Sequence, residues 1–287
     1  METKTPQNSY PKLAKALGVS NIILKREDLN PYGSHKGRSI PLMIETYIKK
    51  GTTNFVISSS GNAALASIRY IQENNKVNTK VTLKILIGKN IEQIKYRLLQ
   101  NEITDENIII EQVHNPKQTA FKMDKEKIAV NLRQSTDDLA LTGYKSLTKE
   151  LKEIKNLQAI FIPTSSGTTA QALAVINTQI HIIQTTNCHP IAENFDKNFE
   201  NTDRSIAGAI VDKVAHRKEK IIELIKKSQG FGWIATDKEI RKAIKLVKEK
   251  TDIDISPNSA LSIAGLQKAI KNNWKWNGTI VCLITGK

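Results

Sequence analysis

The sequence KREDLNPYGSHKGR, residues 25–38, says more about this chain than any other segment. It follows a short apolar run at 22–24 that predicts a strand, and its Asn-Pro and Gly residues predict a tight loop. Ser34 is a good helix N-cap, so Lys36 is expected in the first turn of a helix. The positive end of a helix dipole disfavours an ammonium group, and a partly desolvated neutral amine can attack a carbonyl. Lys36 is therefore a candidate Schiff-base lysine, although a single lysine after a turn is ordinarily a surface residue.

Length and composition favour two domains with a sizeable core. The chain has 287 residues, of which 39% are hydrophobic, and domains average roughly 150 residues. No apolar run approaches the roughly 18 residues of a membrane span, and the opening METKTP has no apolar signal region. The two cysteines, Cys188 and Cys282, lie beside or within strand-like runs, which favours buried thiols and a reducing cytoplasm.

The net charge of +15 is high enough to raise the question of a polyanionic partner. The lysines, however, are spread over helical stretches such as 213–227 and 238–250, where they alternate with Glu and Asp. The sequence has no aromatic platform for stacking bases and no recognised nucleic-acid module, so we expect no nucleic-acid partner. Cys188-His189-Pro190 has no repeat with metal-ligand spacing, so we expect no metal site either.

Strand-like and helical runs alternate along nearly the whole chain, which predicts an α/β fold with largely parallel sheets. The expected strands are 22–24, 55–58, 81–87, 108–110, 159–162, 180–184 and 279–283. The expected helices are 62–72, 92–100, 117–123, 144–154, 169–176, 216–228, 237–250 and 259–271. The polar stretch 134–142 is the expected boundary between two lobes.

Two loops at strand ends have the chemistry of ligand binding. Ser58-Ser-Ser-Gly-Asn62 has small residues at a helix N-terminus, which suits a carboxylate, and Asn62 can donate to an oxygen on a bound ring. The alternative is an ordinary serine-rich helix cap. Pro163-Thr-Ser-Ser-Gly-Thr-Thr169 offers hydroxyls and amides to a phosphate monoester. It lacks the pattern of a nucleotide P-loop and that of a dinucleotide fold.

The hydroxyl of Thr285 follows the last expected strand and is suited to meet a heteroaromatic nitrogen. In open α/β sheets, ligands bind at the carboxyl ends of the strands. A reactive amine, a carboxylate loop, a phosphate cup and a terminal hydroxyl at such ends describe a site for pyridoxal phosphate holding an amino acid. In that site Lys36 would form the Schiff base and the cofactor would act as the electron sink.

From Leu24 to Gly286, the sequence resembles the fold type II pyridoxal phosphate enzymes, the group of tryptophan synthase β, cysteine synthase, threonine dehydratase and threonine synthase. Four segments in family order support the resemblance: Asn30-Pro-Tyr-Gly-Ser-His-Lys36, Ser59-Ser-Gly-Asn62, Thr164-Ser-Ser-Gly-Thr168 and Thr285. The resemblance implies the tryptophan synthase β-like fold, two open, mostly parallel three-layer α/β lobes with the cofactor between them. It implies an N-terminal segment, 1–24, packed on the larger lobe, 141–287, and a smaller lobe, 25–140.

The resemblance also implies residue roles. Lys36 is the implied catalytic lysine, Asn62 is set against the phenolic oxygen of the cofactor, and Thr285 faces its pyridine nitrogen. Arg38 is a candidate for binding a substrate phosphate, and a structural ion pair is the alternative. The implied phosphate cup is Thr164, Ser165, Ser166, Gly167 and Thr168, and the implied substrate-carboxylate loop is Ser59, Ser60, Gly61, Asn62 and Ala63.

Within the group, threonine synthase resembles the chain best, through segments at 205–209, 232–240 and 256–266. The implied function is a lyase of amino-acid biosynthesis that converts O-phosphohomoserine to threonine and phosphate, as a cytoplasmic homodimer. Cysteine synthase-like β-replacement, serine or threonine dehydration, and an inactive binding protein of the same fold are the alternatives. Three departures bear on the substrate: Gly37 where the family usually has Asp, His35 where threonine synthases commonly have Phe, and Gly167 as the only glycine of the cup.

Overall fold

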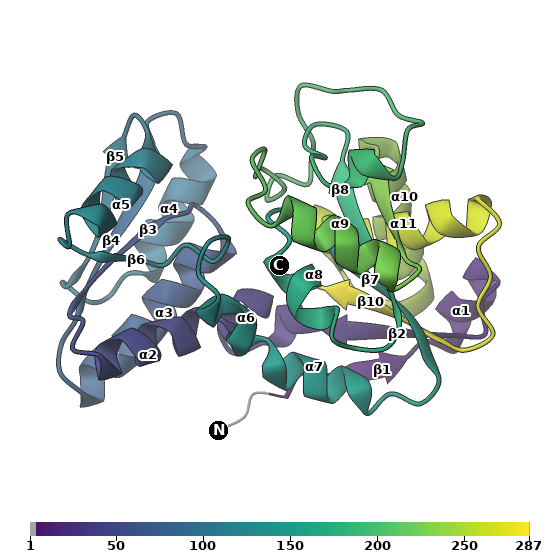
Figure 1. Cartoon of the computed structure of the whole chain (residues 1–287), viewed down its shortest axis with the longest axis horizontal. Helices are drawn as coiled ribbons and strands as arrows, with labels where there is room; N and C mark the ends of the chain where they lie inside the picture. The colour runs from purple at the N-terminus through teal and green to yellow at the C-terminus, as the bar shows by residue number, and fades with distance from the viewer. Residues whose placement is uncertain (1–3, 287) are drawn as a thin grey trace. The chain divides into compact units, whose positions relative to one another are not determined.

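The computed structural model describes residues 4–286, and contacts within the chain divide it into two compact units (Figure 1). The larger unit consists of Met1–Asn30 and Tyr144–Lys287, and the smaller unit of Pro31–Gly143. Each unit has a sheet of its own with helices on both faces, which confirms the predicted α/β class.

The larger unit is built on a six-stranded sheet in the order β1-β2-β10-β7-β8-β9. All neighbouring strands pair in parallel except β1, which runs antiparallel to β2. The strands are β1 (Gln7–Ser9), β2 (Asn21–Arg26), β7 (Leu157–Pro163), β8 (Gln179–Thr185), β9 (Phe231–Ala235) and β10 (Thr279–Ile284). The helices are α1 (Pro11–Leu17), α7 (Lys145–Lys152), α8 (Thr168–Leu173), α9 (Lys218–Lys227), α10 (Asp237–Thr251) and α11 (Pro257–Lys271), with 3-10 turns η1 (Glu27–Leu29) and η3 (Ala192–Asn194).

Strand β10 is buried along all six of its residues, because helices cover both faces of this sheet. Its side chains alternate between two cores: Ile280 and Cys282 pack with α1, α10 and α11, and Val281 and Leu283 pack with α7, α8 and α9. A strand buried on both faces reads as a continuous apolar run, which is how residues 279–283 appear in the sequence. The larger unit therefore has the three layers that the resemblance implies.

The smaller unit has a four-stranded parallel sheet in the order β5-β4-β3-β6. Its strands are β3 (Asn54–Ser58), β4 (Thr82–Gly88), β5 (Ile108–Val113) and β6 (Val130–Asn131). Its helices are α2 (Ile40–Lys49), α3 (Asn62–Val77), α4 (Gln93–Glu102), α5 (Pro116–Lys125) and α6 (Leu139–Gly143), with the 3-10 turn η2 (His35–Arg38). Phe55 and Ile57 of β3 pack toward α2 and α3, whereas Val56 packs toward Ala120 of α5 on the other face.

Every expected strand and helix is present, with ends displaced by a few residues. The sequence patterns did not predict the short elements β1, α1, β6, α6 and β9. In β9 the apolar run is interrupted by Gly232, where a Cβ atom would lie 2.9 Å from the Cα of Ala192 in η3. A glycine inside a strand often marks such a close approach of another backbone. It also interrupts the apolar pattern from which strands are predicted.

The expected lobe limits differ from the compact units at the first boundary. The expected start of the smaller lobe, residue 25, falls inside β2, whose pairing with β10 continues through Arg26. The chain therefore stays with the larger sheet until Asn30. Within residues 4–286, no helix combines the length and the apolar character needed to cross a bilayer. The same residues bring together no group of three or more His, Cys, Asp or Glu side chains able to hold a metal ion.

A buried ion pair anchors the start of the chain to the larger unit. The side chain of Lys25 is fully buried, and its ammonium group contacts the carboxylate of Glu150 in α7. The same ammonium group donates to the backbone oxygen of Thr5 at 2.8 Å, and the Thr5 hydroxyl donates to Glu27 at 2.5 Å. Removing one member of a buried ion pair leaves an uncompensated charge and typically costs about 3–5 kcal/mol.

An aromatic cluster surrounds a buried histidine in β8. The ring of His181 stacks on Phe161 with centroids 4.5 Å apart and accepts a hydrogen bond from Trp233 Nε1 at 3.2 Å. Trp274 and Trp276 meet the same ring edge-on. Because burial penalises the charged form, the pKa of His181 is lowered to about 3.

We predict that this histidine makes the protein less stable in mild acid. Below its ordinary pKa of about 6.5 the unfolded chain binds a proton at residue 181, while the folded protein does not until about pH 3. His181→Gln keeps an acceptor for Trp233 but does not titrate. Between pH 8 and pH 5, the free energy of unfolding of the wild type should fall by about 2 kcal/mol more than that of the variant. Urea unfolding at both pH values measures this, and equal decreases would contradict the assignment.

Candidate active site

The segment around Lys36 forms a short helical turn in the smaller unit. Gly33 has φ +81°, a conformation that glycine adopts without strain. The Ser34 hydroxyl accepts the backbone N–H of Lys36 at 3.2 Å, so the expected N-cap is present. The turn is the 3-10 helix η2 and does not run on as one α-helix. Pro41, in the first turn of α2, has no N–H to continue the hydrogen-bond ladder, so the helix restarts there.

The side chain of Lys36 is half-buried. Within Pro31–Gly143, all of which the structure describes, its ammonium group makes no hydrogen bond or ion pair. A half-buried lysine without a partner in its own unit fits a group that reacts with a ligand. Arg38, two residues on, is only 5% exposed, and both roles considered for it, phosphate binding and a structural ion pair, suit an enclosed side chain.

The expected carboxylate loop joins β3 to α3. The first-turn N–H groups of α3 point out of the start of the helix, and Gly61, its N-cap, has no side chain that could cap them. The Ser59 hydroxyl accepts the N–H of Gly61 at 3.3 Å and fixes the bend of the loop. Ser59, Ser60, Asn62 and Ala63 are half-buried and Gly61 is exposed. Since η2 packs against α3, the lysine turn and this loop occupy neighbouring elements of one unit.

The expected phosphate cup joins β7 to α8 in the larger unit. Gly167 is the N-cap of α8 with φ +89°, and the hydroxyls of Ser166 and Thr168 lie 3.1 Å apart. The other two hydroxyls of the cup bond to the protein backbone. Thr164 donates to the carbonyl of Ile162 at 2.8 Å, and Ser165 accepts the N–H groups of residues 211 and 212 at 3.1 and 3.2 Å. Ser165 thus ties a distant loop to the cup, a role that the local sequence did not indicate.

Parallel pairing brings Thr285 to the same edge as the cup. Cys282 of β10 pairs with Phe161 of β7, so both strands end at the same edge and Thr285 follows β10 where Thr164 follows β7. Thr285 is 5% exposed. Gly286 accepts the hydroxyls of Ser256 and Ser259, at the start of α11, at 2.7 and 2.8 Å. Ser-Pro at a helix start is a recognisable N-cap signal, but its second task of holding the chain beyond β10 depends on the tertiary structure.

The donors in each unit fit one part of pyridoxal phosphate. In the larger unit, the amides at the start of α8, the Ser166 and Thr168 hydroxyls and the Thr285 hydroxyl suit a phosphate and a ring nitrogen. In the smaller unit, the Lys36 amine suits an aldehyde, and the end of α3 suits a carboxylate.

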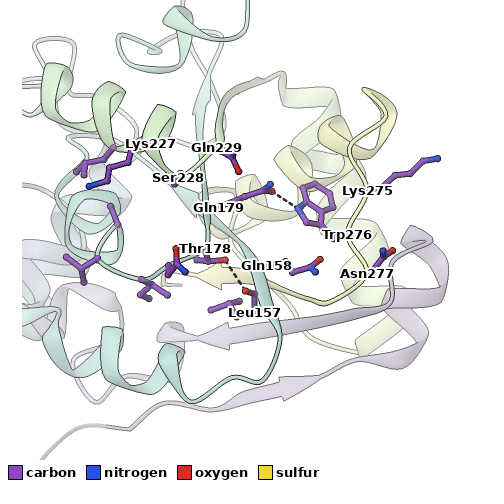
Figure 2. A pocket seen from close by; sticks show the side chains of 15 residues that line it. Leu157, Gln158, Thr178, Gln179, Lys227, Ser228, Gln229, Lys275, Trp276 and Asn277 are labelled. Atoms are coloured by element: carbon purple, nitrogen blue, oxygen red, sulfur yellow. Dashed lines mark hydrogen bonds between the residues drawn. The ribbon is translucent and has the colours of Figure 1, made fainter.

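A groove of about 740 Å³ lies elsewhere in the larger unit, at the amino ends of β7, β8 and β10 (Figure 2). Two of its polar side chains have partners in the protein: Gln179 accepts from Trp276 Nε1 at 2.7 Å, and Gln158 accepts from the N–H of Gly278 at 2.9 Å. Figure 2 shows the ammonium group of Lys275 directed away from Gln158 and Gln179. The groove contains none of the expected site residues.

The chain is similar over its whole length to known proteins. A family model described as pyridoxal-phosphate dependent enzyme matches residues 1–286. Threonine synthase from Methanocaldococcus jannaschii is 26% identical over 311 residues, which cover 99% of this chain and 74% of that protein. The mouse L-serine dehydratase/L-threonine deaminase is 30% identical over 168 residues, covering 58% of this chain and 50% of that protein. The structure of the processed form of threonine deaminase isoform 2 from Solanum lycopersicum covers all of this chain and 84% of its own, with a TM-score of 0.79 and 21% identity.

We predict that Gly167→Ala damages the cup. Its φ of +89° strains any other residue, and a Cβ atom would overlap the end of the Ile221 side chain. The variant should lose about 1–3 kcal/mol of unfolding free energy and bind pyridoxal phosphate more weakly. Gly88→Ala is the control, because its Cβ would meet nothing within 4 Å. Denaturant unfolding and absorbance titration with the cofactor measure both effects, and unchanged cofactor affinity would argue against the cup.

Proposed function

Since the chain belongs to the family of pyridoxal-phosphate-dependent enzymes, we propose that it is a lyase acting on an activated hydroxy-amino acid, in the manner of threonine synthase. The family and the cofactor predicted from the sequence are confirmed by the match over residues 1–286. The proposed reaction converts O-phosphohomoserine and water to threonine and inorganic phosphate. The observation that supports it most is the similarity to threonine synthases over 99–100% of the chain.

Pyridoxal phosphate, when bound, supplies an electron sink for carbanion chemistry. In our proposal Lys36 would hold the cofactor at its aldehyde carbon, and its amine would be free for proton transfer once the substrate is bound. Lys36 then moves protons at Cα, Cβ and Cγ of the substrate, and such positioned proton transfers typically contribute about 10²–10⁴-fold to a rate. Its half-buried side chain, which has no partner in the smaller unit, supports this role.

The remaining roles are part of the same proposal. The loop Ser59–Ala63 binds the substrate carboxylate through the N–H groups at the start of α3, and Asn62 also donates to the phenolic oxygen of the cofactor. The cup 164–168 binds the cofactor phosphate. Thr285 presents a neutral hydroxyl to the ring nitrogen, which leaves the ring unprotonated and suits elimination and replacement chemistry. Arg38 is the candidate for the substrate phosphate.

Dehydration of serine or threonine is the second candidate. The mouse L-serine dehydratase/L-threonine deaminase has the higher identity, 30%, although it matches only 58% of the chain. Gly37 and His35, which depart from the threonine synthase pattern, adjoin Lys36 and could alter substrate choice. A dehydratase would use the same lysine, loop and cup. We further propose that the protein works as a cytoplasmic homodimer.

We predict that the purified protein absorbs at about 410 nm, the band expected when a lysine amine is joined to this cofactor. Lys36→Ala should lose the band and all turnover. Its unfolding midpoint should stay close to that of the wild type, because the Lys36 amine makes no bond within its unit. Lys76→Ala, an exposed lysine of α3, should keep both band and turnover. Turnover retained by Lys36→Ala would disprove the assignment.

A panel of substrates separates the candidate reactions. We expect phosphate release from O-phosphohomoserine, with threonine formed in equal amount. Keto acid formed from serine or threonine in its place would select the dehydratase, and a sulfide-dependent product would select β-replacement. A protein that takes up the cofactor but turns over none of these substrates would contradict the threonine synthase-like proposal.

A further inference from the structure

The residues after β6 lie beside β3, the strand that leads into the loop Ser59–Ala63, and they contact the turn η2 that contains Lys36. Strand β6 pairs in parallel with β3, and the N–H of Leu132 donates to the carbonyl of Val56 at 2.9 Å. Because β3 runs directly into the loop Ser59–Ala63, the residues after β6 emerge at the same edge of the sheet as that loop. Gln134 is one of these residues and is only 7% exposed.

The side chain of Gln134 is hydrogen-bonded to the residue that closes the lysine turn. Its Nε2 donates to the hydroxyl of Ser39, which is fully buried. Ser39 in turn donates to the carbonyl of Lys36, through its N–H at 3.2 Å and through its hydroxyl at 3.5 Å. Water cannot easily replace a bond between two buried groups, so the loss of either partner leaves the other unsatisfied.

Close backbone packing holds the same residues from another element. A Cβ atom on Gly143, the last residue of α6, would lie 2.6 Å from the carbonyl oxygen of Arg38 and 2.9 Å from the Cβ of Ser39. Only glycine allows the backbones to approach this closely. The hydrogen bond from Gln134 and this close contact both hold the chain after Lys36, which leaves it little room to shift.

We propose that Gln134 is a positioning residue that, through Ser39, sets where the Lys36 amine stands relative to the substrate-carboxylate loop. This inference rests on the proposed role of Lys36. Gln134 touches neither substrate nor cofactor in this scheme. Its bond links the turn that contains the amine to the strand pair that leads into the carboxylate loop. A reacting group displaced by about 1 Å loses on the order of 10² in rate, so one buried bond at this place suffices to matter.

The test uses Gln134→Met, which keeps the length of the side chain and removes its donor, Ser39→Ala, and the double variant. Each should lower kcat by about 10-fold or more with little change in KM, because the loop that binds the substrate is intact. The double variant should lose no more than the worse single variant, because both act through one bond. Reduction by borohydride, which joins the cofactor permanently to Lys36, should be slowed in all three and reports on the amine independently of turnover.

Gln72→Met is the matched control. Gln72 belongs to the same unit and accepts the N–H of Thr104 at 2.6 Å, so its loss removes a hydrogen bond far from the turn. The control should keep kcat and the rate of reduction at wild-type values. Equal effects in Gln72→Met and Gln134→Met, or wild-type kcat and reduction in Gln134→Met, would overturn the positioning role alone.

The behaviour of the wild type separates a failure of the proposed function from a failure of the positioning role of Gln134. If the wild type has no absorption band at about 410 nm and borohydride labels no lysine, the proposed function fails and the inference fails with it. If the wild type is labelled at Lys36, only the behaviour of the variants decides the inference. Ser39→Ala, the smaller change, provides the result if Gln134→Met does not fold.

Discussion

The parallel pairing of β10 with both β2 and β7 is the constraint on which the larger unit depends. Parallel strands end at the same edge, so Thr285 after β10, the cup after β7 and the turn η1 after β2 all leave the sheet together. The six buried residues of β10 hold this register by filling both cores. A slip of one residue would exchange the faces of every side chain, which makes the register costly to change. The smaller sheet follows the same rule with β3 and β6.

Serine hydroxyls hold several loops in place around the candidate site. Ser165 holds the backbone at residues 211 and 212, Ser256 and Ser259 hold Gly286, and Ser39 joins Gln134 to the lysine turn. In a protein with a glycine-poor cup, such hydroxyls shape the loops, because they accept from backbone N–H groups or donate to backbone carbonyls that would otherwise be unpaired. The hydroxyls that remain suited to a ligand are a subset of those that the sequence suggests.

Family membership and substrate rest on different parts of the chain. The family match extends over residues 1–286, and the strand ends and loops proposed to bind the cofactor lie within it. In our proposal, substrate choice depends on a few residues near the amine, among them His35 and Gly37, which differ from the threonine synthase pattern. At 26% identity to a threonine synthase, the common fold is secure and such side chains are free to differ. One fold can host several reactions, so the substrate panel and not the fold decides between them.

What the sequence alone determined is local or periodic. The N-cap at Ser34, the strand and helix order and the cofactor were all predictable, because caps, hydrophobic periods and short loop motifs depend on neighbouring residues. Only the tertiary structure decided that Gln134 bonds Ser39, that Gly143 leaves no room for a side chain, and that Ser165 serves a distant loop. Those contacts join residues some tens of positions apart or more. They arise from the packing of whole elements, to which no short stretch of sequence gives a signal.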